Sequence, residues 1–516
     1  MTQFNTQSKL STHSSYPTNL LWFLISALVL VAITCAPIAS LLNLFHDDSF
    51  FYMVIARNHA AGLGYSFDGL NATNGFHHFW LWTLSFLGSF IALTGDQGIR
   101  VVVALQTLLS LSAALIYVRM LRAFTVSPWV QILFFLAFVF LCTLADIGQE
   151  SALYSFLAAL IVSILLSDRA DAPITVNGSR LLMLLILVVL TVLSRLDCVF
   201  LLGGIAFALI LAQHKQESLV VSLGIALGLA STFSFNYLVF GHAYSISSWL
   251  KSGFDVSKAL QLLIPGLLIR VGLVCLLLSG ALWQLKRAHA FTDLRIAPSK
   301  LPFIALLIMS VSLAYGAYFV VLFLQVSALG SWYFNQALGL SAFLFALTFS
   351  HSDTRAQSKI AFIPLLVALA IGATLFVSKF LWAHSSDATR EIGQWIYNNT
   401  KSDTVIFQRD GAGAVSYFAQ RPIINGDGLV NNMQYQVMLR SGRLCDYLKE
   451  QQVQFVVSNT DVGFTGQIQD YIFLWTKGLT SLPLTNVAPS LALYTTQARP
   501  HYRIFQLADA VTVCQK

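Results

Sequence analysis

The chain is poor in charge. Only 10% of its 516 residues are Asp, Glu, Lys or Arg, whereas hydrophobic residues make up 56% and the mean hydropathy is +0.71. Soluble globular domains carry about 25% charged residues, so this composition excludes an ordinary soluble protein. No Walker motif is present, and Gly411-Ala412-Gly413 lacks the third glycine and the distal acid of a dinucleotide site. The sequence therefore gives no sign of a nucleotide cofactor.

What the chain does have is a series of apolar runs, each long enough to approach or cross a hydrocarbon core about 30 Å thick. They recur from Leu20 to about Ala383, and polar and apolar residues then alternate irregularly up to Lys516. The sequence predicts a mostly α-helical fold with a cytoplasmic tail (1–19), a polytopic transmembrane domain (20–383) and a C-terminal soluble α/β domain (384–516). About eleven spans are expected, at 20–44, 98–118, 128–147, 150–167, 180–194, 198–213, 218–240, 263–285, 302–325, 331–350 and 359–382.

Basic residues are unevenly divided between the two sets of loops, which predicts orientation because cytoplasmic loops collect Lys and Arg. With the N-terminus inside, most loop Lys and Arg fall on the cytoplasmic side. The first external loop (45–97) and the C-terminal domain then lie outside. The net charge of +7 reports this topology and gives no support for a nucleic-acid partner.

The apolar stretch His78–Thr94 is ambiguous, because counting it as a span would place every later loop on the opposite side of the membrane and so put Arg119 and Arg122 outside. We therefore expect a helix that lies in or dips into the outer interface, with Trp80 and Trp82 at headgroup level.

An acidic pair, Asp47-Asp48, follows the first apolar segment and opens a half-apolar helix. Ionised side chains near hydrocarbon are costly unless they are solvated, paired or used. One alternative is that Asp48 is only an N-cap. A cap explains one acid but not two, so the pair predicts a general base, or carboxylates that bind a divalent cation such as Mg or Mn. No metal is required by the sequence.

Three basic residues on the outer side are candidates for holding a lipid phosphate: Arg57, Arg195 and Lys251. Each of them can instead pair with a local acid or reach lipid headgroups. Arg195 is the strongest candidate because it lies between two apolar spans, with only Asp197 nearby to compensate its charge.

Other polar and aromatic residues gather at the same outer boundaries and are candidates for substrate contacts. They are Asn74, His77, His78, Glu150, Trp332 and Tyr333. The two histidines have no Cys or third His nearby, so a zinc site is weakly supported. A helix cap is the alternative for Glu150, and an interfacial aromatic belt is the alternative for Trp332 and Tyr333.

The C-terminal domain has alternating elements. Helical spacing at 389–398 and 442–451 is combined with short strand patterns at 405–407 and 455–457. The turn Asp427-Gly428-Leu429-Val430 is a candidate loop facing the membrane site. Cys445 and Cys514 are the pair of cysteines in this domain, and a disulfide between them is plausible if the domain is external.

The order of these motifs resembles the membrane-embedded GT-C glycosyltransferases, particularly bacterial relatives of protein mannosyltransferases and arabinofuranosyltransferases. The matching elements are Asp47-Asp48-Ser49-Phe50, Ala56-Arg57-Asn58, Gly62-Leu63-Gly64-Tyr65, Asn74-Gly75-Phe76-His77-His78-Phe79-Trp80, Gly148-Gln149-Glu150-Ser151-Ala152-Leu153, Ser194-Arg195-Leu196-Asp197 and Trp332-Tyr333. The departures are His78 and Leu196 where the family has Pro, and Gln149 where it has Met.

The resemblance implies transfer of a sugar from a polyprenyl-phosphate-linked donor at the outer face, with Asp47 or Asp48 as base and inversion at the anomeric carbon. The acceptor, whether glycan, lipid or protein, stays open, and family analogy suggests a bacterial inner membrane with a periplasmic site. A transporter or flippase of a polar lipid is the alternative, but its acids would be expected at the bilayer midplane. A non-catalytic scaffold would need no acidic pair.

Overall fold

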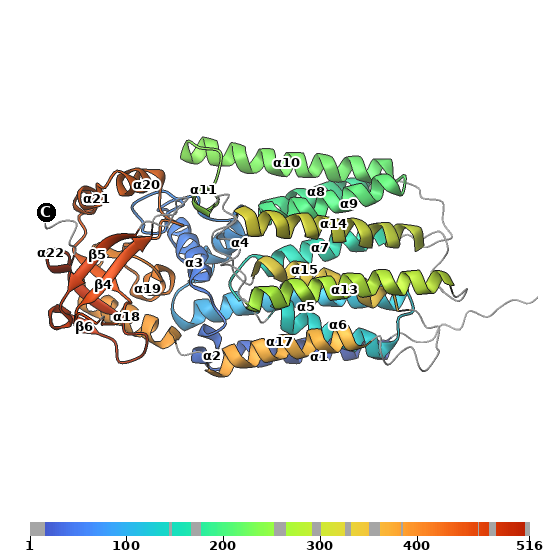
Figure 1. Cartoon of the computed structure of the whole chain (residues 1–516), viewed down its shortest axis with the longest axis horizontal. Helices are drawn as coiled ribbons and strands as arrows, with labels where there is room; N and C mark the ends of the chain where they lie inside the picture. The colour runs from blue at the N-terminus through green and yellow to red at the C-terminus, as the bar shows by residue number, and fades with distance from the viewer. Residues whose placement is uncertain are drawn as a thin grey trace, which may run out of the picture.

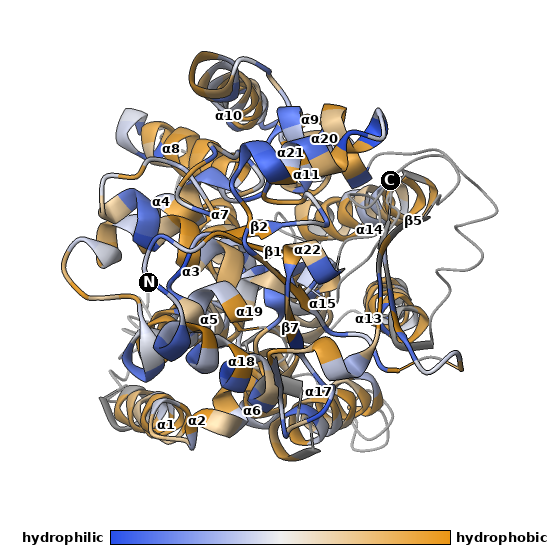
Figure 2. Cartoon of the chain, turned by 90° about the vertical axis from the view of Figure 1, so that its left-hand side faces the viewer, coloured by the Kyte–Doolittle hydropathy of each residue, from blue (hydrophilic) through white to orange (hydrophobic). Residues whose placement is uncertain are grey.

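The computed structural model describes residues 16–143, 147–166, 177–251, 265–290, 301–325, 332–349, 362–382, 385–462, 464–473 and 481–510. A long bundle of apolar helices adjoins a smaller C-terminal region that contains a sheet (Figure 1). The mostly helical fold with a C-terminal α/β part is as the sequence predicts. Figure 2 looks onto that region from its own end of the molecule and shows that its ribbon combines hydrophilic and hydrophobic residues.

Eleven helices correspond to the predicted apolar segments. They are α1 (Tyr16–Thr34), α5 (Gly95–Ala123), α6 (Pro128–Phe138), α7 (Ser151–Leu166), α8 (Gly178–Ser194), α9 (Val199–Leu211), α10 (Lys215–Phe240), α13 (Pro265–Ala290), α14 (Leu301–Gln325), α15 (Trp332–Leu347) and α17 (Ile363–Trp382). Within the described residues, five are long and apolar enough to cross a membrane, namely those at 95–123, 215–240, 268–285, 303–324 and 363–381.

Two predicted spans are not single α-helices. The first, predicted at 20–44, ends at Thr34, and Pro37 then starts the short helix α2 (Ile38–Leu42). Proline disfavours helical backbone at the residue before it, which accounts for the break. The span predicted at 128–147 continues from α6 into a π-helical turn at Val139–Thr143.

The 45–97 loop contains α3 (Asp47–Ala60) and α4 (His78–Gly88). With 11 residues, α4 is much shorter than the roughly 20 residues that a span needs. Trp80, expected at headgroup level, is instead fully buried, and its indole N–H donates to the Gly148 carbonyl oxygen at 3.0 Å. The loop is therefore packed onto the bundle.

The C-terminal region is a small α/β unit. Its five-stranded sheet has the order β2-β1-β3-β7-β6, formed by β1 (Ile406–Gln408), β2 (Ile423–Asn425), β3 (Phe455–Ser458), β6 (Tyr494–Thr495) and β7 (Arg503–Gln506). The strands β2, β1 and β3 are parallel, whereas β7 and β6 are antiparallel. The predicted strands at 405–407 and 455–457 are thus confirmed.

The remaining elements of this region are five helices and a separate two-stranded sheet. They are α18 (Ser385–Asn399), α19 (Ala412–Ala419), α20 (Met433–Arg440), α21 (Leu444–Glu450), α22 (Leu507–Ala510), β4 (Ile468–Phe473) and β5 (Ser481–Val487). The helices predicted at 389–398 and 442–451 correspond to α18 and α21. Cys445 is disulfide-bonded, and Cys514, the partner predicted for it, lies outside the described residues.

The carboxyl ends of the parallel strands face the 45–97 loop. The segment after β1 leads into α19, which packs on α3, and the segment after β2 meets residues 73–75 of the loop. Figure 1 places α3 and α4 between the bundle and the C-terminal region. Because carboxyl edges of parallel sheets commonly carry binding sites, this junction is a candidate binding site.

Candidate active site

A cavity of about 330 Å³ lies at this junction, a size within the range of small-molecule sites. Its polar lining among the described residues consists of Asp48, Tyr52, His77, Gln149, Glu150, Arg195, Asp197, Ser245, Ser247, Ser248, Lys251, Tyr318 and Tyr333. Its apolar lining consists of Phe51, Ile55, Phe76, Leu196, Phe200, Val321, Leu322, Trp332 and Leu429. Charged groups and hydroxyls therefore share one cavity with an apolar wall.

Asp48 is the second residue of α3 and lies in the cavity wall. His46 occupies the N-cap position, so the alternative that Asp48 is only an N-cap is wrong. A carboxylate in the first turn still interacts favourably with the helix dipole. Within the described residues, Asp48 is in no ion pair, whereas the other two carboxylates of the cavity are both paired with Arg195.

Asp47, the neighbouring acid, is not among the residues that line the cavity. Its two carboxylate oxygens accept hydrogen bonds from the backbone N–H groups of Gly413 (3.0 Å) and Ala414 (2.8 Å), at the start of α19. A Cβ atom at position 413 would overlap the Asp47 backbone carbonyl oxygen, so this approach requires glycine. Asp47 thus joins the C-terminal region to the helix that carries Asp48.

Asp47 makes this contact dependent on pH. Burial raises the pKa of Asp47 to about 7, although the N–H groups of Ala414 and Gly413 lower it. Because the folded pKa is raised, the stabilisation is complete below the unfolded value of about 4 and is lost as pH rises through 7. We expect the Asp47 contribution to make the free energy of unfolding fall between about pH 4 and pH 7, by at most about 1.4 kcal/mol per pH unit. In Asp47→Asn the slope over this range should decrease by that contribution, and an unchanged slope in calorimetry would contradict the assignment.

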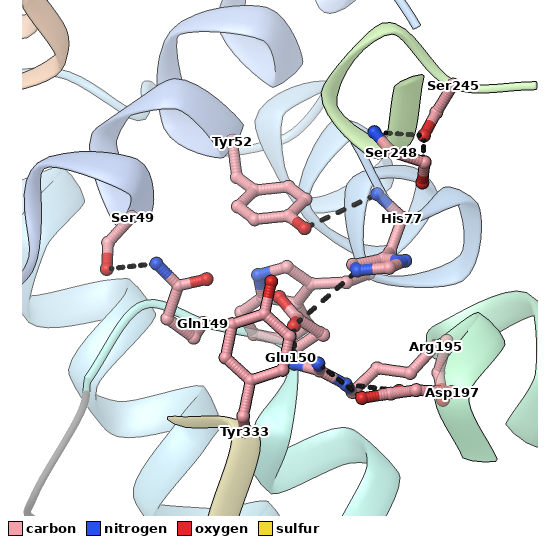
Figure 3. A network of polar contacts seen from close by, with 12 residues as sticks. Ser49, Tyr52, His77, Gln149, Glu150, Arg195, Asp197, Ser245, Ser248 and Tyr333 are labelled. Carbon is pink, nitrogen blue, oxygen red and sulfur yellow. Dashed lines mark hydrogen bonds and ion pairs between the residues drawn. The ribbon is translucent and has the colours of Figure 1, made fainter. Parts of the chain in front are cut away.

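A buried network of charged groups forms the floor of the cavity (Figure 3). The Arg195 guanidinium donates to Glu150 and makes two bonds to Asp197, at 2.8 Å from Nε to Oδ1 and 2.7 Å from Nη2 to Oδ2. The Tyr318 hydroxyl donates to Asp197 Oδ2 at 2.7 Å. Only 2% of the Glu150 side chain and 4% of the Arg195 side chain are exposed. Replacing one charged residue of this network by a neutral one is costly, because it leaves a buried charge unpaired.

The surroundings of Arg195 therefore differ from the sequence-based expectation, in which only Asp197 lies near enough to compensate its charge. Glu150, at the start of α7, supplies a second carboxylate, and the Tyr333 ring lies 4.9 Å from the guanidinium carbon. With both carboxylates ionised, the trio carries a net negative charge, so its single cation is already compensated.

Lys251, at the end of α11 (Ile246–Lys251), is a second cation among the described residues that line the cavity. Burial lowers its pKa, but Tyr333, Asp48, Asp427 and Glu150 together raise the pKa above its ordinary value, so the ammonium stays charged. Hydroxyl groups lie on the same segment. Ser245 and Ser248, bonded to each other at 2.7 Å, line the cavity together with Ser247. A cation beside hydroxyl donors is suited to an anionic oxygen.

His77 lies between the network and α11 (Figure 3), with its Nε2 atom 3.8 Å from Glu150 Oε1. Its backbone N–H donates to the Tyr52 hydroxyl at 3.3 Å. Burial lowers the pKa of His77 below its ordinary value, so the imidazole is neutral at pH 7. It presents a hydrogen-bonding group to the cavity without adding charge.

Three other residues singled out from the sequence lie away from this cavity. Arg57 donates to the Tyr417 carbonyl oxygen of α19 at 3.3 Å. Asn74 accepts from the backbone N–H of Ile246 at 2.9 Å and so fixes the start of α11, and His78 bonds Asn236 at 3.2 Å. These side chains support the site from outside, whereas Trp332 and Tyr333 do line the cavity.

The C-terminal region forms part of the cavity wall through Leu429. A Cβ atom at Gly75 would overlap the Leu429 carbonyl oxygen, and Thr73 Oγ1 donates to the Asn431 carbonyl oxygen at 2.8 Å. Residues 427–430 are predicted from the sequence to form a loop that faces the membrane site, and Leu429 lies there. Tyr52, Tyr318 and the three serines could not be predicted in the same way, because an isolated hydroxyl in an apolar sequence carries no pattern.

The site does not fit a metal held by the acidic pair. Asp47 uses both oxygens to bind α19 while Asp48 faces the cavity. In the part of the chain that the structure describes, no group of three or more His, Cys, Asp or Glu side chains is arranged to hold a metal ion.

Comparisons with known proteins give a fold but no close relative. Residues 380–505 match a family described as a domain of unknown function (DUF8728), and no curated protein matches the chain. Among solved structures, ArnT from Cupriavidus metallidurans bound to undecaprenyl phosphate is 12% identical, with a TM-score of 0.59. The match covers 97% of this chain and 99% of that one.

Two further structures share the architecture. The Archaeoglobus fulgidus oligosaccharyltransferase tethered with an acceptor peptide has a TM-score of 0.54 at 14% identity, over 97% of this chain and 78% of its own. The mycobacterial arabinofuranosyltransferase AftD has a TM-score of 0.52 at 15% identity, over 94% of this chain and 40% of its own. The chain thus has the fold of the GT-C glycosyltransferases, as the resemblance implies.

Proposed function

We propose that the chain is an integral-membrane glycosyltransferase that moves a sugar from a polyprenyl-phosphate-linked donor to an acceptor. The observation that supports it most is the cavity itself. There a carboxylate that makes no ion pair with the described residues (Asp48), a charged lysine (Lys251) and an apolar wall meet at one end of a bundle of apolar helices. The GT-C fold and the undecaprenyl phosphate bound by ArnT support this proposal.

In the proposed reaction, Asp48 accepts the proton of an acceptor hydroxyl. The acceptor oxygen forms a bond to the anomeric carbon while the bond from that carbon to the phosphate oxygen breaks, so configuration inverts. Polyprenyl phosphate leaves with the electron pair. Asp47 and Arg57 act as positioning residues, since both hold α3 against α19.

The donor phosphate binds Lys251 and the adjacent serine hydroxyls, and the network around Arg195 keeps the floor of the cavity rigid. The first isoprene units lie against Phe200, Val321 and Leu322, which come from α9 and α14. Since a lipid-linked donor cannot leave the bilayer, a cavity that joins an apolar wall to a cation suits it. We place the site and the C-terminal region on the periplasmic side of a bacterial inner membrane, following the distribution of basic residues.

The test is an assay of the purified chain with a panel of polyprenyl-phosphate sugars. We expect one donor to yield sugar-modified acceptor together with free polyprenyl phosphate. A flippase or transporter would instead move the intact lipid across a liposome membrane without cleaving it, and that result would replace the proposal.

Lys251→Met tests the phosphate contact. A hydrogen bond to a charged group contributes about 1.5–3 kcal/mol, so we expect the donor KM to rise by about tenfold or more while the acceptor KM changes little. Lys449→Met, on α21 outside the cavity, is the matched control. An unchanged donor KM in Lys251→Met would remove this lysine from the donor site.

A further inference from the structure

A second cavity, of about 310 Å³, lies where the 45–97 loop, the end of α10 and the start of α20 meet. Its polar lining among the described residues consists of Thr73, Asn74, His242, Asn431, Asn432 and Gln434. Resting on the proposed function, we propose that this second cavity binds a sugar unit of a neutral glycan acceptor, away from the hydroxyl that reacts.

The second cavity adjoins the active-site cavity. Residues 73–74 line the second cavity, whereas residues 75–77 line the active-site cavity. In the same way, His242 and residues 431–434 line the second cavity, whereas Ser245 and Leu429 line the first. A wall of main chain, in which Gly75 lies against Leu429, therefore separates the two cavities. We expect a glycan whose terminal hydroxyl lies beside Asp48 to reach the second cavity with a later sugar unit.

The lining of the second cavity is polar but has no Asp, Glu, Lys or Arg among the described residues. A phosphate or carboxylate would find no compensating cation there, so its desolvation would be costly. Val239, Phe240 and Met433 add an apolar surface to the amide groups. Hydroxyl groups both donate and accept hydrogen bonds, and the C–H face of a sugar can pack on apolar side chains. The lining therefore suits a neutral saccharide.

Several of the polar side chains hold the walls of the second cavity together. Thr73 Oγ1 donates to the Asn431 carbonyl oxygen at 2.8 Å, which joins the 45–97 loop to the C-terminal region. Asn74 Oδ1 accepts from Ile246 N at 2.9 Å, and its Nδ2 donates to the Tyr244 carbonyl oxygen at 3.0 Å. The walls are thus connected to one another in the structure without a ligand.

Other side chains of the lining keep hydrogen-bonding capacity for a ligand. Asn432 Nδ2 donates to Asn71 Oδ1 at 3.2 Å, which leaves its second N–H. His242 uses Nδ1, 3.0 Å from the Tyr244 carbonyl oxygen, which leaves Nε2. The exposed Gln434 makes no hydrogen bond with the part of the chain that the structure describes, so its amide offers both donors and an acceptor.

The first experiment measures binding to the purified full-length chain without any donor. The probes are maltotriose, mannotriose and galactotriose, which are neutral, and trigalacturonic acid, which is anionic. We expect the wild type to bind a neutral trisaccharide more tightly than the acid. Gln434→Ala should weaken this binding by about three- to tenfold, the effect of losing one neutral hydrogen bond. Gln434→Lys should bind trigalacturonic acid about tenfold more tightly than the wild type does, because it adds a charged donor.

Gln454→Ala and Gln454→Lys are the matched controls. Gln454 is also an exposed glutamine of the C-terminal region, but it lines neither cavity. Both controls should bind every probe as the wild type does.

The second experiment uses the donor identified in the transfer assay. Gln434→Ala should raise the KM for the neutral trisaccharide acceptor by the same factor, about three- to tenfold. The KM for the corresponding monosaccharide, which is too short to occupy both cavities, should not change, and neither should the donor KM. A general disturbance of the site would raise all three KM values together and would overturn the proposal.

Equal binding of every neutral trisaccharide by the wild type and Gln434→Ala, no binding of any of them, or a wild-type preference for trigalacturonic acid also overturns it. Competition by glycerol 3-phosphate would assign the second cavity to a lipid headgroup instead. If a neutral trisaccharide binds in a Gln434-dependent manner but no donor supports transfer, the sugar site stands and the proposed function fails.

Discussion

Asp48→Asn is expected to reduce sugar transfer by at least about 100-fold, because general-base catalysis contributes roughly 10²–10⁴-fold. The asparagine has nearly the same shape but cannot accept the proton. Glu150 and Asp197 cannot replace it, since both are held by Arg195. Binding of undecaprenyl phosphate, followed by a shift in thermal unfolding, should be retained. Initial rates at saturating donor and acceptor measure the effect.

Asp47→Asn is the matched comparison, since it removes the adjacent carboxylate by the same chemical change. One oxygen of the new amide still accepts a bond from the start of α19, so we expect a smaller loss of rate, about tenfold, together with the altered dependence of stability on pH. The reverse order, with Asp47→Asn inactive and Asp48→Asn active, would show that the base assignment is wrong.

Gly75→Ala has the second large expected effect. The new methyl group would overlap the Leu429 carbonyl oxygen. Because both groups are attached directly to the main chain, relieving the overlap requires the backbone to move. Overpacking costs about 1–3 kcal/mol even in adaptable cores. We expect the 425–431 loop to move from the cavity, with a lower unfolding temperature, a rate at least tenfold lower and faster hydrogen exchange at residues 425–431.

Gly203→Ala controls for this change, because position 203 lies within α9 and has open space around its Cβ direction. This variant should match the wild type in rate and be equally or slightly more stable, because alanine has a higher helix propensity than glycine. If Gly75→Ala behaved like Gly203→Ala, the C-terminal region would not be a functional wall of the site.

The apolar runs predicted most helices because burial and membrane crossing both follow from local composition. The acidic pair located the right helix, but adjacent residues of a helix point about 100° apart. Which of Asp47 and Asp48 faces the cavity depends on where α19 packs, and α19 begins 365 residues after Asp47 in the chain. No local pattern contains that information.

The same limit explains the other differences. Arg195 was expected to hold a phosphate because its neighbours offered one acid, yet the fold brings Glu150 to it from 45 residues away. Arg57 was expected at the donor site but reaches a carbonyl of α19. The cavity is completed by Ser247, Lys251 and Leu429 from distant segments. The sequence indicated Lys251 by its charge and Leu429 by its place in the 427–430 turn, but nothing in the sequence indicated Ser247.

The most direct test labels a cysteine placed at Ser247, in a chain whose Cys35 and Cys275 are replaced by serine. A membrane-impermeant maleimide is added to right-side-out vesicles with and without added undecaprenyl phosphate. Labelling from the outer side that this lipid slows at least tenfold is the predicted result. Labelling from the cytoplasmic side alone, or an outer-side rate that the lipid leaves unchanged, would contradict a lipid-phosphate site at the outer face.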